Sequence, residues 1–118
     1  MPMRVRSRIA LGLIALALGL LVAPRVVRAE DLYAVTLVAK DGHFFPETLR
    51  VPAGRKFKIV IRNEGQGPEE FENVELKREK VLPAGATSFL VFAPLKPGVY
   101  PFFGEFHPET AKGRIVVE

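Results

Sequence analysis

The stretch KPGVYPFFGEFHPETAKGRIVVE, residues 96–118, decides the fold of this chain. Its Pro-Gly pair marks a turn and introduces the aromatic run VYPFF, which is typical of a β-strand. A polar loop with two acids and one histidine follows, and GRIVVE then reads as another strand. The stretch therefore predicts two strands that are joined by a loop carrying ionisable side chains.

The sequence upstream has the same organisation of short strands and turns. β-Branched and aromatic residues concentrate or alternate at residues 32–39, 47–51, 56–63 and 86–94. Asp-Gly and two Pro-Ala-Gly turns separate these runs. No stretch has sustained helical periodicity, although residues 73–80 are compatible with one or two helical turns. About seven or eight short strands predict an all-β fold, an antiparallel Greek-key sandwich.

Residues 1–29 have the pattern of a secretory signal peptide. The first eight residues carry three arginines and no acid, an unbroken apolar run of 14 residues follows, and Val27 and Ala29 suit positions −3 and −1 of a cleavage site. Fourteen helical residues span about 21 Å, short of the ~30 Å hydrocarbon core. We therefore expect cleavage after Ala29, a single domain at residues 30–118 and a periplasmic protein. An uncleaved membrane anchor is the alternative.

Composition excludes several classes of function. All five charged residues of the predicted signal peptide are arginines, so the mature chain has 12 basic and 13 acidic residues, and the positive formal charge of the full chain (+4) comes from the predicted signal peptide. This balance argues against nucleic-acid binding. The chain has no cysteine, which excludes redox dithiols, Cys-ligated zinc and iron–sulfur clusters. Two histidines without a nucleophile motif argue against a Ser-His-Asp hydrolase.

The order of the motifs resembles the cupredoxin fold. FFP, the first PAG turn, a strand ending at Asn63, the acid-rich PEEFEN, the second PAG turn, KPGVYPFFGEFH and KGRIVVE follow one another. Within this fold, residues 34–118 resemble the EfeO-type cupredoxin-like domains and the small exported FtrB-like proteins that accompany bacterial iron-uptake permeases. The resemblance implies a metal-binding protein that assists iron uptake. The partners it implies are a membrane iron permease or other periplasmic iron-uptake components. A second copy of this chain, in a homodimer, is a further candidate partner.

The positions that match the blue-copper ligands depart from that pattern. A blue-copper site takes one histidine before the last loop, then cysteine, histidine and a weak axial methionine around it. By resemblance, the first histidine position is Glu69 or Glu70, the cysteine position is Gly104, and the methionine position is Ala111. The second histidine is present as His107. Blue-copper electron transfer is therefore excluded.

A different set of metal ligands occupies the same two segments, which the resemblance brings to one end of the sandwich. Because residues i and i+2 of an extended strand point the same way, Glu105 is expected to point with His107. Carboxylates with an imidazole suit Cu(II), Fe(II)/Fe(III), Mn(II) or Zn(II) rather than Cu(I). Other acids are expected to form a solvated surface: Glu64, Glu75 and Glu79. The expected metal ligands are Glu70, Glu105 and His107, with Glu69, Glu72, Glu109 and His43 as further candidates.

The predicted function is binding or relay of copper or iron, as Cu(II) or Fe(II)/Fe(III), beside a ferric permease. One mononuclear site passes one electron, whereas oxygen reduction needs more, so an independent oxidase is disfavoured and no catalytic residue is assigned. Fe(II) oxidation and Fe(III) delivery both stay open. The alternative is a metal-free β-sandwich that serves as an interaction module of the cell envelope. Cu(I) storage is disfavoured because the mature chain has neither Cys nor Met.

Overall fold

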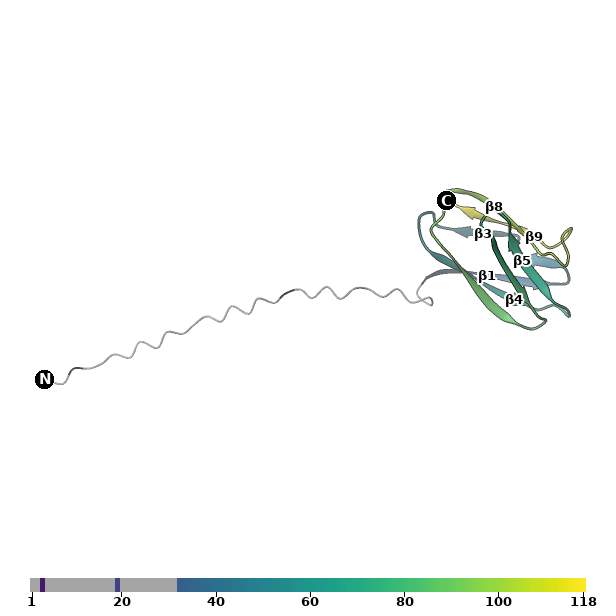
Figure 1. Ribbon diagram of the computed structural model, residues 1–118, viewed down its shortest axis with the longest axis horizontal. Coiled ribbons are helices and arrows are strands. Elements are labelled where there is room, and N and C mark those ends of the chain that lie inside the picture. The colour runs from purple at the N-terminus through teal and green to yellow at the C-terminus, as the bar shows by residue number, and fades with distance from the viewer. Residues whose placement is uncertain (1–2, 4–18, 20–31) are drawn as a thin grey trace.

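The computed structural model describes residues 32–118, together with the isolated residues Met3 and Gly19. Most of the predicted signal peptide, including its cleavage site, lies outside the described residues. Within residues 32–118, nine strands form two sheets (Figure 1). The first sheet has the order β2-β1-β4-β7, with β1 (Tyr33–Lys40), β2 (His43–Phe45), β4 (Phe57–Asn63) and β7 (Thr87–Phe92). The second has the order β3-β9-β8-β5-β6, with β3 (Thr48–Val51), β5 (Glu69–Asn73), β6 (Arg78–Leu82), β8 (Gly98–Phe103) and β9 (Lys112–Val117).

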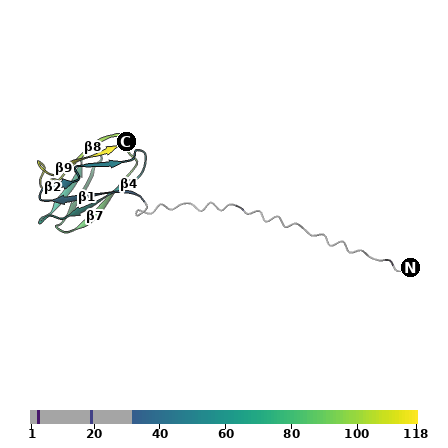
Figure 2. The ribbon, with the colours of Figure 1, turned by 180° about the vertical axis from the view of Figure 1, so that it is seen from behind.

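The all-β sandwich predicted from the sequence is confirmed, with two differences in detail. The described part of the chain has nine strands rather than seven or eight, and β2, β5 and β6 have no clear strand pattern in the sequence. Two strand pairs, β1 with β4 and β3 with β9, are parallel, so both sheets are mixed (Figures 1 and 2). Parallel neighbours arise because the chain crosses to the other sheet between them instead of returning through a hairpin. No helix of the described residues is long and apolar enough to cross a bilayer.

Residues 73–80, which were compatible with helical turns, form a β-hairpin instead. The side chain of Asn73 accepts a hydrogen bond from the amide of Leu76 (2.7 Å), which closes the turn after β5. The same side chain donates to the carbonyl oxygen of Pro101 (2.8 Å) and ties the hairpin to β8. The hairpin register places Glu72 directly opposite Glu79. Two carboxylates therefore become neighbours on one face of the sheet.

The core lies between the two sheets and is rich in phenylalanine. Alternation along β4 turns Phe57, Ile59 and Ile61 inward, as the sequence predicts, and each is at most 1% exposed. The second sheet contributes Phe71 and Phe102, whose ring centroids lie 5.0 Å apart. Burial of such side chains contributes roughly 1.5–3 kcal/mol each. This core holds the sheet ends in place, and the loops that carry the candidate site extend from those ends.

Candidate metal centre

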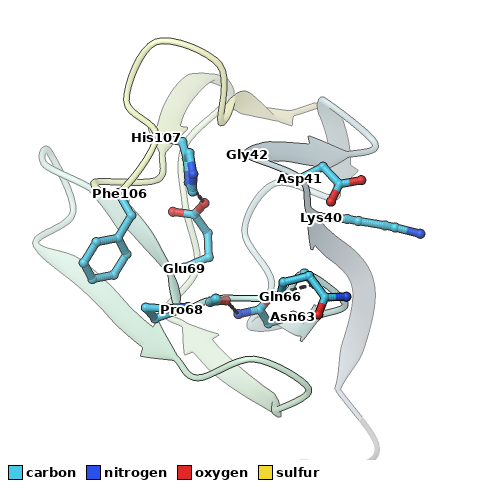
Figure 3. Close-up of a pocket in the computed structure, with 11 residues that line it drawn as sticks. Lys40, Asp41, Gly42, Asn63, Gln66, Pro68, Glu69, Phe106 and His107 are labelled. Carbon is cyan, nitrogen blue, oxygen red and sulfur yellow. Dashed lines mark hydrogen bonds and ion pairs between the residues drawn. The ribbon is translucent and has the colours of Figure 1, made fainter.

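Glu69 and His107, called the inner pair below, meet at one end of the sandwich. Glu69 is the first residue of β5, and His107 lies in the turn between β8 and β9. Nδ1 of His107 lies 2.6 Å from Oε2 of Glu69, and Figure 3 shows the carboxylate directed at the imidazole ring. The Glu69 side chain is 6% exposed and that of His107 is 50% exposed. The pair lines a pocket of about 390 Å³.

The turn that carries His107 is closed by its own backbone. The amide of His107 donates to the carbonyl oxygen of Gly104 (3.1 Å), and the amide of Ala111 donates to the carbonyl oxygen of His107 (2.8 Å). Because this segment is a turn and not an extended strand, the spacing rule for strands does not hold in it. The prediction that Glu105 and His107 point together is therefore wrong.

The β1–β2 hairpin supports the His107 ring from the other side. Asp41 and Gly42 have φ angles of 51° and 74°, which is the type I′ geometry that an Asp-Gly pair favours. A Cβ atom added at Gly42 would lie 3.0 Å from Cδ2 of His107, so the ring packs directly on the glycine. Thr110 also donates a hydrogen bond from Oγ1 to the carbonyl oxygen of Gly42 (2.6 Å). The ring is thus held between Gly42 and Glu69.

The space at the cysteine position of the blue-copper pattern is filled by Glu69. A Cβ atom at Gly104 would collide with Oε1 of Glu69 and lie 2.9 Å from the carbonyl oxygen of Glu70. The same Oε1 accepts a hydrogen bond from the amide of Glu70 (3.1 Å). Ala111, at the methionine position, is fully buried and offers no donor atom. The residues present therefore do not fit a type 1 copper ion.

The remaining acids of PEEFEN do not face His107. Successive strand residues alternate between faces, so Glu70 and Glu72 lie on the opposite side of β5 from Glu69. One carboxylate oxygen each of Glu70, Glu72 and Glu79 lies within 4.8 Å of the others. Burial, followed by the neighbouring carboxyls of Glu105 and Glu72, raises the pKa of Glu70 to about 8. Glu70, Glu72, Glu79 and Glu105 together form the outer carboxylate group.

The structure thus divides the predicted ligand set into two. Glu69, not Glu70, is the acid that contacts His107, and Glu105 lies with Glu70. The sequence predicts that Glu79 lies on the solvated surface. The structure shows that Glu79 is exposed, and the hairpin register also places it opposite Glu72. The signal that could have found it is the antiparallel pairing of EEFEN with REKVL across a tight turn.

Glu109 and His43 lie outside both groups. Glu109 is exposed in the turn between β8 and β9. His43 is exposed on β2, where it pairs with Lys40 of β1, and its ring centroid lies 6.2 Å from that of Phe45. Among the described residues, neither belongs to a cluster of three or more donors.

Comparisons with known proteins agree with this architecture. The model of the cupredoxin-like domain family matches residues 10–117. The "Uncharacterized protein RP394" of Rickettsia prowazekii is 39% identical over 88 residues, which are 75% of this chain and 70% of that protein. Reduced auracyanin from Roseiflexus castenholzii superposes with a TM-score of 0.63 at 13% identity, over 72% of this chain and 96% of its own. A purple cupredoxin from Nitrosopumilus maritimus gives a TM-score of 0.55 at 19% identity, over 71% and 99%. At these identities the two solved structures share the fold alone with this chain.

Proposed function

This chain belongs to the cupredoxin-like domain family, and we propose that it binds one transition-metal ion between Glu69 and His107, without sulfur. The observation that carries the proposal is the contact of 2.6 Å between His107 Nδ1 and Glu69 Oε2. By resemblance, His107 matches the second histidine of the blue-copper pattern, and Glu69 is one of the two residues that match the first.

The geometry of the inner pair is close to that of a chelate. Metal bonds of about 2.0–2.1 Å that meet at a right angle hold nitrogen and oxygen about 2.9 Å apart. The pair therefore has to open by only about 0.3 Å to admit an ion. His107 is half exposed and sits on a turn, so it supplies this movement, whereas Glu69 is buried and fixed by the Glu70 amide. Nδ1 of His107 would have to be free of a proton for the pair to hold an ion, so binding would be weaker at low pH.

The donor set determines the kind of ion. Imidazole and carboxylate suit Cu(II), Zn(II) and iron, and the general order of affinities favours Cu(II) over the other divalent ions of the first row. We therefore propose Cu(II) or Fe(II)/Fe(III) as the ion. Two protein donors leave positions open for water or an incoming ligand, which suits capture and release. A single ion also suits relay better than independent oxidation, because oxygen reduction requires more than one electron.

The site of action is proposed from the sequence. The pattern of residues 1–29 supports export to the periplasm. The resemblance to EfeO-type and FtrB-like proteins supports a role beside a membrane iron permease, in Fe(II) oxidation or Fe(III) delivery. Uptake of ⁵⁵Fe by a deletion strain tests this role: the wild-type gene restores uptake and the His107→Ala gene does not. A deletion strain whose uptake is normal, or is not restored by the wild-type gene, contradicts the role; equal restoration by both genes contradicts the need for His107.

Titration calorimetry tests the metal site directly. Protein dialysed against a chelator and then against chelator-free buffer is titrated with Cu(II), Zn(II) and, without oxygen, Fe(II). We expect a Kd below about 10 μM, which corresponds to roughly −7 kcal/mol, for Cu(II) at least. His107→Ala and Glu69→Gln each weaken binding at least tenfold. The EPR spectrum of the Cu(II) form shows coupling to one imidazole nitrogen, which His107→Ala removes.

His43→Ala is the matched control, because it removes an exposed imidazole that lies outside the inner pair. Its affinity equals that of the wild type. If His43→Ala weakens binding as much as His107→Ala does, the ion lies elsewhere. If the wild type binds none of the ions more tightly than about 10 μM, the inner pair is not a metal site, and the alternative of an interaction module of the cell envelope is favoured.

A further inference from the structure

The outer carboxylate group forms a compact set of oxygen donors on the other face of β5 from the inner pair. Glu70 and Glu72 point outward from β5, and Glu79 stands opposite Glu72 across the β5–β6 hairpin. Their nearest carboxylate oxygens lie within 4.8 Å of one another. Glu105, in the turn that follows β8, places a fourth carboxyl beside Glu70.

Glu70 provides the independent observation that points to a ligand. The residue is 4% exposed, and its Oε1 has neither contact with solvent nor a hydrogen-bond partner. A buried carboxyl oxygen without a partner costs free energy, and the groups beside Glu70 are the carboxyls of Glu105 and Glu72. Within residues 32–118, no Lys or Arg forms a salt bridge with any member of the group.

We infer that the outer carboxylate group binds a hard divalent cation, of the oxygen-preferring class of Ca²⁺ and Mn²⁺. Bonds of about 2.3–2.6 Å to Ca²⁺ allow two coordinating oxygens to lie up to about 5 Å apart, so the three clustered oxygens can share one ion. The group has only oxygen donors and no imidazole, which distinguishes it from the inner pair and disfavours Cu(II) and Zn(II). The cation also supplies the partner that Oε1 of Glu70 lacks.

A cation at this position links segments that the backbone joins weakly. In the described residues, β5 and β8 share the single paired position Glu72–Phe103, whereas β5 and β6 share five. Glu105 belongs to the chain just after β8, and Glu79 belongs to β6. An ion bound by both therefore joins the hairpin to the β8–β9 turn and stabilises the folded state.

Thermal unfolding with added Mn²⁺ or Ca²⁺ tests the inference. After removal of metals with EDTA, we expect the Tm to rise by roughly 10 °C at a hundredfold excess over Kd. The variant Glu72→Gln/Glu79→Gln loses this rise. Its two positions are at least partly exposed, so the fold survives, and circular dichroism checks this. The single variant Glu79→Gln, at an exposed position, binds Mn²⁺ at least tenfold more weakly than the wild type. EPR of the free Mn²⁺ ion measures this affinity.

Two controls distinguish cation binding by the outer carboxylate group from binding by scattered surface acids or by the inner pair. Glu64→Gln/Glu75→Gln removes two exposed charges that do not belong to the outer carboxylate group, and it keeps the rise in Tm. His107→Ala also keeps the rise in Tm. This inference therefore stands even if the inner pair binds no metal, and the proposed function stands even if the outer carboxylate group binds no cation. The inference is overturned if His107→Ala abolishes Mn²⁺ and Ca²⁺ binding, if Glu72→Gln/Glu79→Gln retains it, or if neither ion binds with a Kd below about 1 mM.

Discussion

Replacing Gly104 with alanine tests whether the Glu69 carboxylate has taken the space of a copper-binding cysteine. The new Cβ atom would collide with Oε1 of Glu69 and lie 2.9 Å both from Cδ of Glu69 and from the carbonyl oxygen of Glu70. Gly104 is not among the residues with positive φ, so alanine suits the backbone conformation. The substitution therefore adds no strain from a positive φ angle, and its destabilising effect comes from the filled space.

Two opposing effects set the size of the change in stability. Alanine restricts the unfolded chain and stabilises the protein by about 0.4–1 kcal/mol. A methyl group forced into filled space costs about 1–3 kcal/mol. The cost lies toward the upper end, because one contact is with the backbone and because Glu69 is held by His107 and by the Glu70 amide. We expect a net loss of about 1–2 kcal/mol and a fall in Tm of roughly 5–15 °C.

Urea unfolding of four proteins in EDTA measures the competition for this space: the wild type, Gly104→Ala, Glu69→Ala and the double variant. If the methyl group and the carboxylate occupy one space, the double variant loses less stability than the sum of the single variants, by about 1 kcal/mol. Gly67→Ala is the control, because nothing lies within 4 Å of a Cβ atom added there. Its stability is unchanged or slightly higher.

The reasoning is refuted if Gly104→Ala is as stable as the wild type. It is also refuted if the effects of Gly104→Ala and Glu69→Ala simply add. Either result would mean that the cysteine position is open, and that Glu69 has not replaced the sulfur ligand in the structure of this loop.

Two further predictions concern pH and a buried amide. Because the pKa of Glu70 is raised from 4.5 to about 8, the folded protein keeps a proton that the unfolded chain releases; in EDTA, stability falls as pH rises from about 4.5 to 8. Glu70→Gln removes most of this slope in urea unfolding, and an unchanged slope contradicts the assignment. Asn63 is 3% exposed and donates to the carbonyl oxygens of Gly67 (2.9 Å) and Leu82 (3.0 Å), so Asn63→Ala loses about 2–4 kcal/mol. The exposed control Gln66→Ala loses less than about 0.5 kcal/mol, and equal losses would contradict the role of Asn63.

The features that could be predicted from the sequence depend on local pattern. Phe57, Ile59 and Ile61 alternate along their strand, and the structure buries all three. Asp41-Gly42 predicts a tight turn, and both residues have positive φ. The absence of cysteine excludes thiolate chemistry whatever the fold. Resemblance also identified Gly104 as the position of a missing ligand, which is where the Glu69 carboxylate now lies.

The division of the acids could not be predicted in the same way. EEFEN has acids on both faces of a five-residue strand, so its periodicity does not say whether Glu69 or Glu70 faces inward. The inward position of Phe71 settles this, because alternation then turns Glu69 toward His107 and Glu70 away. Glu79 joins Glu72 only through the hairpin register.

By itself, the sequence determined an all-β domain at residues 30–118 that has neither Cys nor Met and carries two acid-bearing segments and a histidine. Alternation, turn residues and composition are properties of neighbouring residues. Only the tertiary structure decided that these segments form an inner pair and a separate outer carboxylate group. The physical reason is that strand phase and register follow from packing between the two sheets, and a shift of one residue exchanges the two faces of a strand.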